Sequence, residues 1–174
     1  MKTERIHLRR LTLADSERVA FLANNENIFR NTLSLPFPYT EADAINWISS
    51  HEENFAVDRA YDYAIVNTTD DLIIGVIGLS NYGHYRGELG YWVGEDYWNM
   101  GYATEAAKLI LDYAFNHLNY NRVYARHIES NPASGKVMQK IGMTYEGCQR
   151  EHEYVNDVYV NMILYGIIKS DYKK

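Results

Sequence analysis

The feature that most constrains how this chain can fold is a strand, a short loop and a helix that follow one another between Glu88 and Ala107. Residues 86–93 are predicted to form the strand, and apolar residues recur at helical spacing from Ala103 to Ala114. Residues 122–128 are predicted to form the next strand. A helix that joins two strands of one sheet leaves them parallel, so this segment indicates an α/β protein.

The remaining elements extend this unit into a larger sheet. Further strands are predicted at residues 5–11, 61–67, 72–79, 144–154 and 158–168, and further helices at 14–25, 40–48 and 132–141. Pro36 and Pro38 break both helix and strand, so residues 33–39 are expected to form an ordered loop. Hairpin neighbours are antiparallel. We therefore expect a single α/β domain over residues 1–174, with a mixed, mostly antiparallel sheet and flanking helices.

Composition argues against several classes of function. The net charge is −6, whereas nucleic-acid binding needs clustered Lys and Arg. The single cysteine, Cys148, cannot form an intramolecular disulfide, and the six histidines lack metal-ligand spacing, so no metal site is expected. Residues 1–5 lack the apolar run of a signal peptide, and no segment approaches the ~20 apolar residues of a membrane span. These features predict a cytoplasmic protein without a membrane or nucleic-acid partner.

The start of the helix after Trp98 is predicted to bind an anion. The first backbone N–H groups of a helix lack partners and carry a partial positive charge. Gly101 and Ala103 are small, so a phosphate can approach the backbone closely. The segment is neither G-x-x-x-x-G-K-[ST] nor G-x-G-x-x-G. Its spacing alone is equally compatible with a plain strand-to-helix connection whose small residues allow close packing.

Two segments resemble the GCN5-related N-acetyltransferases (GNAT). Residues 97–106, Tyr-Trp-Asn-Met-Gly-Tyr-Ala-Thr-Glu-Ala, are similar to that family's acyl-CoA pyrophosphate loop, and residues 131–143 are similar to its N-x-x-S segment. Residues 6–11, 36–40 and 88–92 resemble the branch that acetylates the N-termini of ribosomal proteins (RimJ/RimL type). The resemblance covers nearly the whole chain. It implies a GNAT-like fold and an N-acetyltransferase that uses acetyl-CoA and no metal.

The resemblance also implies how acetyl-CoA would be held. The backbone N–H groups of residues 99–104 would bind the pyrophosphate, and the strand end at Trp92 and Val93 would pair with the pantetheine arm. A backbone N–H near Val93 would polarise the thioester carbonyl, a contribution of ~3 kcal/mol in a dry site. The residues implied to bind the cofactor are Trp92, Val93, Asn99, Met100, Gly101, Tyr102, Ala103, Thr104, Asn131 and Ser134.

Glu88 is the candidate general base. An amine is mostly protonated at neutral pH, with a reference pKa of about 8 for an α-amine and about 10.4 for lysine, so some group must take its proton directly or through water. Strand alternation puts Glu88, Gly90 and Trp92 on one face, and Gly90 leaves space beside the carboxylate. The alternative is that Glu88 is an ordinary solvated residue of a strand.

Ser134 is the second candidate catalytic residue. Asn131 is expected to cap the helix that begins at Pro132. The resemblance adds that Ser134 donates a hydrogen bond to the departing thiolate and that Asn131 contacts the pantetheine. Many family members have a tyrosine acid where this chain has Met138, which cannot donate a proton, so the acid role would fall to Ser134 or water. Many also have Arg or Gln where this chain has Trp98.

These assignments predict direct transfer of acetyl from acetyl-CoA to a primary amine in a ternary complex, without a covalent enzyme intermediate. The acceptor is open between a protein N-terminus, a polyamine and another small amine. A non-catalytic acyl-CoA-binding module would keep the helix start without needing Glu88. By resemblance, residues 36–39 and 145–159 would line the acceptor pocket. The late strands are compatible with a monomer or a homodimer.

Overall fold

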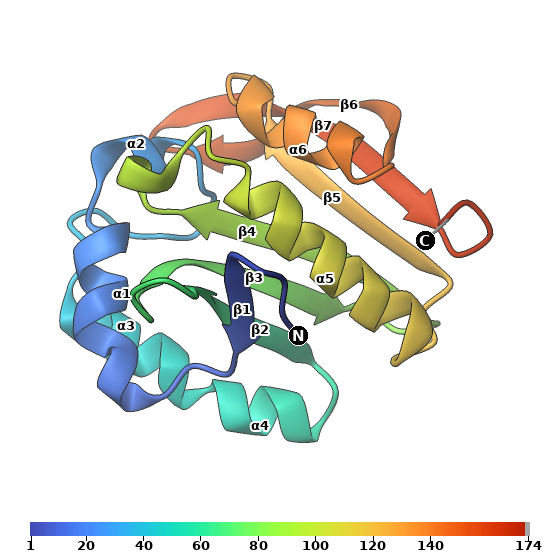
Figure 1. The fold of residues 1–174 in the computed structure, drawn as a ribbon. Helices are drawn as coiled ribbons and strands as arrows, with labels where there is room; N and C mark the ends of the chain where they lie inside the picture. The colour runs from blue at the N-terminus through green and yellow to red at the C-terminus, as the bar shows by residue number, and fades with distance from the viewer. Residues whose placement is uncertain (173–174) are drawn as a thin grey trace.

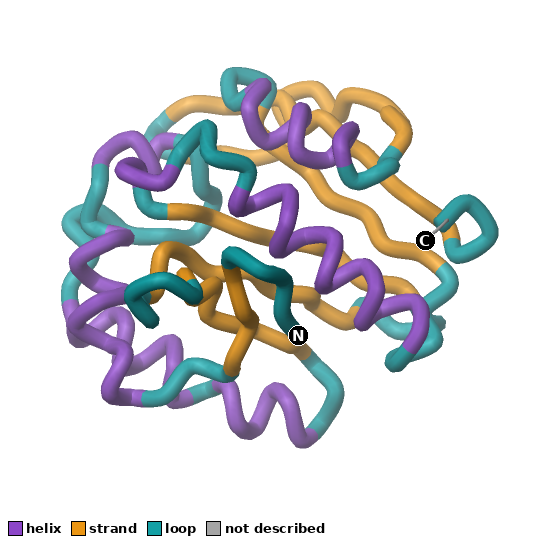
Figure 2. Tube along the Cα trace, in the orientation of Figure 1, coloured by secondary structure: helices purple, strands orange, loops and turns teal. Residues whose placement is uncertain are grey.

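The computed structural model describes residues 1–172, which form one seven-stranded sheet with helices on both faces (Figures 1 and 2). The strands are β1 (Ile6–Arg9), β2 (Ala60–Asn67), β3 (Ile73–Asn81), β4 (Arg86–Val93), β5 (Arg122–Ile128), β6 (Thr144–Val155) and β7 (Val158–Ile168). The α-helices are α1 (Ser16–Ala23), α2 (Glu26–Arg30), α3 (Glu41–Ser49), α4 (His51–Ala56), α5 (Tyr102–Asn116) and α6 (Pro132–Lys140). Two 3-10 turns are η1 (Leu13–Asp15) and η2 (Glu95–Tyr97). This confirms the predicted α/β class.

The sheet is mixed, as predicted, because one pair of neighbouring strands is parallel. The strand order is β1-β2-β3-β4-β5-β7-β6, and every neighbouring pair except β4 and β5 is antiparallel. The parallel pair is joined only over Arg86–Glu88 and Arg122–Tyr124. Beyond Glu88, the two strands diverge toward their C-terminal ends (Figure 1). The sheet therefore has a gap between β4 and β5.

The two faces of the sheet bury different clusters. On one face, α5 packs against β4 through Leu89 and Val93. On the other face, α1 and α3 contribute Val19 and Ile48, and Trp92 of β4 packs against this second cluster. Fully burying one aliphatic side chain contributes about 1.5–3 kcal/mol. Since β4 is packed on both faces, it is a rigid element on which to mount a site.

The structure differs from the sequence expectation mainly in two short helices. α2 begins after Asn25, whose side chain accepts hydrogen bonds from the backbone N–H groups of Asn27 and Ile28. α4 follows α3 directly after Ser50. Helices of five and six residues are too short to show a 3.6-residue period, so periodicity cannot detect them. The predicted helix over residues 40–48 is confirmed as α3, and Thr40 and Asp43 form a reciprocal capping box at its start.

Candidate functional site

The predicted anion site is a left-handed turn followed by the first turn of α5. Gly101 is the N-cap residue with φ +85°, a conformation that glycine adopts without the steric cost of a Cβ, and no side chain caps the helix. The first helical hydrogen bond runs from Glu105 to the Gly101 carbonyl, 3.0 Å away. Among residues 1–172, no acceptor is found for the N–H groups of Tyr102, Ala103 and Thr104. Three free N–H groups therefore lie at the positive end of a 15-residue helix.

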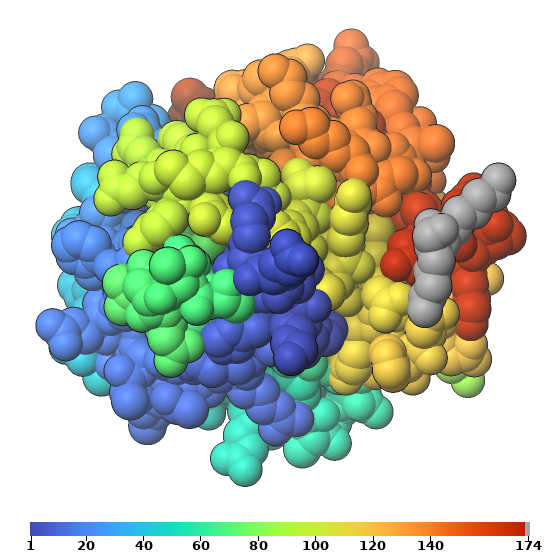
Figure 3. All heavy atoms as spheres, in the orientation of Figure 1, coloured from blue at the N-terminus to red at the C-terminus, as the bar shows by residue number. Residues whose placement is uncertain are grey.

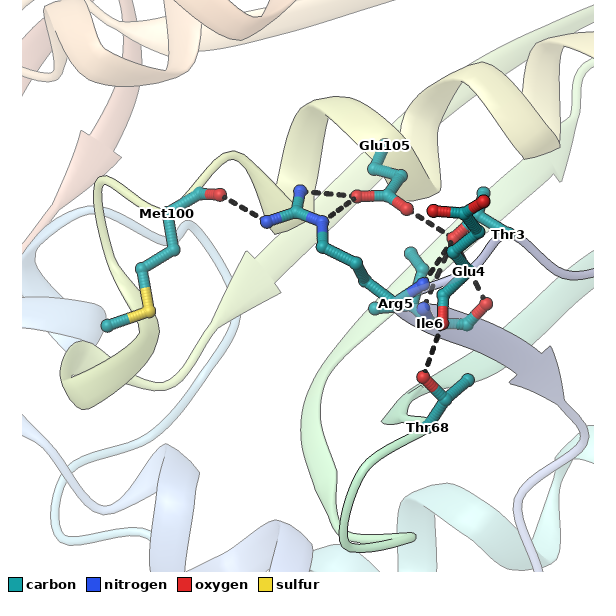
Figure 4. Close-up of polar contacts among 7 residues, drawn as sticks. All are labelled: Thr3, Glu4, Arg5, Ile6, Thr68, Met100 and Glu105. Carbon is teal, nitrogen blue, oxygen red and sulfur yellow. Dashed lines mark hydrogen bonds and ion pairs between the residues drawn. The ribbon is translucent and has the colours of Figure 1, made fainter.

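Arg5 fixes the loop in front of this helix (Figure 4). Its guanidinium donates to the Met100 carbonyl at 3.1 Å and, through Nε, to the Glu105 carboxylate at 2.9 Å. It also lies over the Tyr102 ring, 4.8 Å from the centroid. Figure 3 shows the N-terminal segment packed on the surface beside this loop. In a trans peptide the C=O and N–H point in opposite directions, so holding the Met100 carbonyl turns the N–H of Gly101 away from Arg5.

The turn between β4 and α5 is closed by Trp98. Its indole N–H donates to the Val93 carbonyl at 2.6 Å, and the Gly94 N–H donates to the Ile74 carbonyl at 2.8 Å. The indole therefore anchors the loop to the end of β4. This contact gives a structural use to the residue that stands where many GNAT members have Arg or Gln.

On the face of the sheet that carries α5 and α6, Tyr91 of β4 forms hydrogen bonds with Ser134 of α6. The Tyr91 hydroxyl donates to the Ser134 carbonyl at 2.9 Å and lies 2.9 Å from the Ser134 hydroxyl, where either atom can be the donor. Burial raises the pKa of Tyr91 to about 12, so the phenol stays protonated at neutral pH. Tyr91 was not among the residues predicted from the sequence, although its position, alternating with Gly90 and Trp92, already put it on the opposite face of β4.

The start of α6 holds Ser134 beside Tyr91. The Asn131 side chain accepts a hydrogen bond from the Ser134 N–H at 3.3 Å, and Pro132 occupies the first turn, so the predicted capping is confirmed. Met138 is 1% exposed and belongs to the core below α5, which agrees with its exclusion as an acid. A tyrosine hydroxyl reaches Ser134 nevertheless, because Tyr91 supplies it from β4.

Glu88 lies on the other face of β4. Its carboxylate accepts from Arg126 Nε at 2.7 Å and from the Tyr124 hydroxyl at 3.2 Å. Arg126 also bonds Glu153 of β6 at 2.8 Å. The Glu88 side chain is 19% exposed, so it is not an ordinary solvated strand residue. A Cβ placed on Gly90 meets no atom within 4 Å, which confirms the predicted space beside Glu88.

A groove of about 440 Å³ opens on the same face, beside Trp92. It is lined by Ser34, Leu35, Pro36, Tyr39, Asp43, Asn46, Trp47 and Trp92. Part of the proline-containing loop thus borders the face of β4 that carries Glu88. The other segment implied by the resemblance, residues 145–159, reaches this face through Glu153, which bonds Arg126.

The site residues named from the sequence fall into two groups on opposite faces of β4. Residues 99–104, Asn131 and Ser134 lie with α5 and α6, whereas Glu88 and Trp92 lie on the side of α1 and α3. Glu88 and Ser134 do not share a hydrogen bond: Ser134 of α6 contacts Tyr91 of β4, and Glu88 contacts Arg126 of β5. The arrangement can hold an anionic ligand on one face and a different molecule on the other, with contact between them through the gap.

Two further properties concern only the described part of the chain. Within residues 1–172, no group of three His, Cys, Asp or Glu side chains is placed to hold a metal ion. Over the same residues, every helix is too short or too polar to cross a bilayer.

Comparison with known proteins identifies a family whose model matches most of the chain. Residues 5–144 match the model of the acetyltransferase (GNAT) domain. An uncharacterised N-acetyltransferase of Bacillus subtilis, YnaD, is 32% identical over 83% of this chain and 82% of its own length. The putative ribosomal N-acetyltransferase YdaF of the same organism is 28% identical over 98% of this chain and 94% of its own length.

Solved structures agree with these matches. A probable acetyltransferase superposes with a TM-score of 0.90 at 26% identity, covering 98% of this chain and 96% of its own. Spermidine N-acetyltransferase from Vibrio cholerae, solved with CoA and spermine, superposes with a TM-score of 0.82 at 22% identity, covering 97% and 98%. The second likeness concerns the fold alone, and both bear out the expected GNAT-like fold.

Proposed function

Because the chain belongs to the GNAT acetyltransferase family, and is therefore an acetyl-CoA-dependent N-acetyltransferase, we propose that it transfers the acetyl group directly to a primary amine in a ternary complex. The observation that carries this proposal is the division of β4 into two faces joined at the gap beside β5. Two substrates can approach the gap from opposite sides, so no acyl-enzyme is needed to bring them together.

The face that carries α5 and α6 is the donor side. The free N–H groups of Tyr102, Ala103 and Thr104 would bind the pyrophosphate, and the unpaired edge of β4 beyond Glu88 would take the pantetheine arm. Bound there, acetyl-CoA supplies an activated acyl group. A backbone N–H near Val93 would stabilise the negative charge that develops on the carbonyl oxygen. Asn131 adds a polar group at the mouth of the gap, where it caps α6.

In this mechanism, the acceptor would lose a proton on one face of β4, and the sulfur of the departing thiolate would gain a proton on the other face. The ammonium of the acceptor loses one proton, directly or through water, to Glu88, and its lone pair then forms the C–N bond. The C–S bond breaks and its electron pair leaves with sulfur, which takes a proton from the Ser134 and Tyr91 hydroxyls. The amide nitrogen loses its second proton, which restores that pair. The balance is one proton released for each acetyl group transferred.

Chemistry common to two relatives supports a primary amine as the acceptor. YdaF is named a putative ribosomal N-acetyltransferase, and the Escherichia coli spermidine N(1)-acetyltransferase, 27% identical over 96% of this chain, acts on a polyamine. Both names denote a primary amine as nucleophile. The acidic and aromatic groups on the Glu88 face, with the groove beside Trp92, suit such a cationic acceptor.

The test is thiol release from acetyl-CoA with a panel of peptides with free N-termini, polyamines and simple amines. We expect at least one class to support turnover and mass spectrometry to show one acetyl group on its nitrogen. Tyr91→Phe should lower kcat by about tenfold, less than the roughly 10²–10⁴-fold typical of a general acid, because the Ser134 hydroxyl remains. Cys148→Ala, on the exposed edge strand, should retain activity. Binding of acetyl-CoA without acetylation of any amine, or a trapped acyl-Cys148, would overturn the proposal.

A further inference from the structure

A second carboxylate faces the same side of the sheet as Glu88. Asp62 of β2 is paired with Gly78 of β3, which is paired with Gly90 of β4. Directly paired residues in a sheet point to the same face, so Asp62, Gly90 and Glu88 share one face. A Cβ on Gly78 would overlap Asp62 Oδ1, while a Cβ on Gly90 would meet nothing within 4 Å. The carboxylate of Asp62 therefore leans over the bare backbone of β3 toward an open floor at Gly90.

The Asp62 carboxylate has no hydrogen-bond donor among residues 1–172. Its one ionic neighbour there is His51 of α4, whose Nε2 lies 3.8 Å from Oδ2, beyond hydrogen-bond distance. The Asp62 side chain is only 21% exposed. Burial raises its pKa to about 6, which leaves it charged at neutral pH in a place where solvation is poor. Burying a charge without hydrogen bonds costs free energy, so a hydrogen-bond donor that paired with this carboxylate would be stabilised there.

His51 leaves this charge uncompensated. The residue is 5% exposed, and neither ring nitrogen has a hydrogen-bond partner within residues 1–172. Its ring lies edge-on to Trp47, with the centroids 4.4 Å apart, and Trp47 lines the groove beside Trp92. Burial lowers the pKa of His51, so the ring is neutral at pH 7. A buried polar side chain without hydrogen-bond partners calls for a physical reason. Here the uncharged ring packs behind the Asp62 carboxylate without pairing with it.

The two carboxylates on this face differ in what they can still bind. Glu88 already accepts hydrogen bonds from Arg126 and Tyr124, on the side of β5. Asp62, on the side of β2, accepts no hydrogen bond within residues 1–172 and has only the distant His51 as an ionic neighbour. An ammonium group offers three donors and no acceptor, which matches a site that contains only acceptors. Neighbouring strands lie about 4.8 Å apart, so β2 and β4 are about 10 Å apart and one ammonium cannot serve both carboxylates.

We propose that Asp62, with the His51 ring behind it, binds a second positively charged group of the acceptor, so that the enzyme prefers primary amines carrying another cationic centre. The inference rests on the proposed N-acetyltransferase function and deepens it. The acetylated nitrogen lies at the gap beside Glu88, and the second cation lies over Gly78 and Gly90. A polyamine and a peptide with a basic side chain near its N-terminus share this chemistry.

The experiment compares 1,4-diaminobutane with n-butylamine, and a peptide with Lys next to its N-terminus with its norleucine counterpart. For the wild type, we expect kcat/KM to be about tenfold higher for the dicationic member of at least one pair, as one charge-assisted hydrogen bond provides. In Asp62→Asn this ratio falls to about one, because KM rises for the dicationic substrate alone. The pair that shows the effect distinguishes a polyamine from a peptide.

Two variants separate the subsite from general damage. Gly78→Ala keeps the charge but displaces the Asp62 carboxylate, and it should remove the same preference. Glu52→Gln removes an exposed carboxylate of α4, next to His51, and should leave the ratio unchanged. A ratio that survives Asp62→Asn would overturn the subsite while leaving the N-acetyltransferase proposal intact. If no amine is acetylated, calorimetric binding of 1,4-diaminobutane to wild type and Asp62→Asn tests the subsite alone, and equal affinities overturn it.

Discussion

The two faces of β4 differ in the kind of chemical group that they present, backbone groups on one and side chains on the other. On the proposed donor side, the groups that would face the ligand are backbone N–H groups, exposed by Gly101 at the start of α5 and held by Arg5 through the Met100 carbonyl. On the acceptor side they are side chains, and they come from separate strands: Glu88 from β4, Asp62 from β2 and Arg126 from β5. A backbone site fixes the shape of its ligand, whereas side chains can change without altering the fold. The contrast explains why a donor site can be shared within a family whose acceptors differ.

The largest effect that would sharpen this comparison is expected at Glu88. Glu88→Gln removes the proposed base and keeps its size, so kcat should fall by roughly 10²–10³-fold, within the range for general base catalysis. Affinity for acetyl-CoA, measured by calorimetry, should stay within twofold, because Glu88 is on the acceptor face. Asp15→Asn, which weakens an ion pair of similar length with Arg9 of β1, is the control and should retain activity. A Glu88→Gln enzyme with nearly full kcat would show that the proton leaves by another route.

The next effect is expected at Gly101. Alanine at φ +85° strains the backbone by ~1 kcal/mol and moves the N–H groups that face the pyrophosphate, so the Kd for acetyl-CoA should rise by at least about tenfold. Gly83→Ala is the matched control, since Gly83 also has a positive φ, +72°, and open space around it, but lies in the β3–β4 turn. Equal losses of acetyl-CoA affinity in the two variants would mean that strain, and not the position of the N–H groups, is responsible.

How far the sequence could predict these faces depends on how local the signal is. Gly101 and the Asn131 cap are local features, and so the two helix starts could be predicted without a structure. Their assignment to acetyl-CoA came from the resemblance and stays a proposal. Arg5 could not, because its partner Glu105 is 100 residues away and no local pattern connects them. Tyr91 was available from strand alternation, but its contact with Ser134 depends on how α6 packs beside β4.

The acceptor face was harder to predict for the same reason. Asp62 looks like any polar residue of a strand until the register shows that Gly78 and Gly90 lie beside it. His51 belongs to a helix too short to be detected from periodicity, and its burial depends on contacts with α3 and β2. Strand order and sheet register are long-range properties, and a single sequence carries little information about them.

A smaller effect concerns stability and pH. The pKa of Asp62 is about 6 in the folded chain, against 3.8 in the unfolded chain. The folded state therefore holds this proton more tightly, and the stability that this gives is full below pH 3.8 and is lost as pH rises through 6. His51 acts in the opposite sense, since its lowered pKa gives stability above pH 6.5 that is lost as pH falls. Asp62→Asn should therefore be more stable than wild type at pH 7.5 by about 2 kcal/mol, and this advantage should vanish by about pH 4. Urea denaturation at both pH values measures it, and a destabilised Asp62→Asn at pH 7.5 would contradict the uncompensated charge.

The central claim, that β4 separates donor from acceptor, is tested most directly by measuring both substrate affinities in Gly90→Ala and Gly101→Ala. A Cβ at Gly90 meets no protein atom but fills the acceptor floor. It should therefore raise KM for the amine by about tenfold, the size of effect that one added or missing methyl group has in a binding pocket. The Kd for acetyl-CoA should stay unchanged. Gly101→Ala should do the reverse. If each variant instead changes both constants by the same factor, the two faces of β4 do not divide the substrates and the account is wrong.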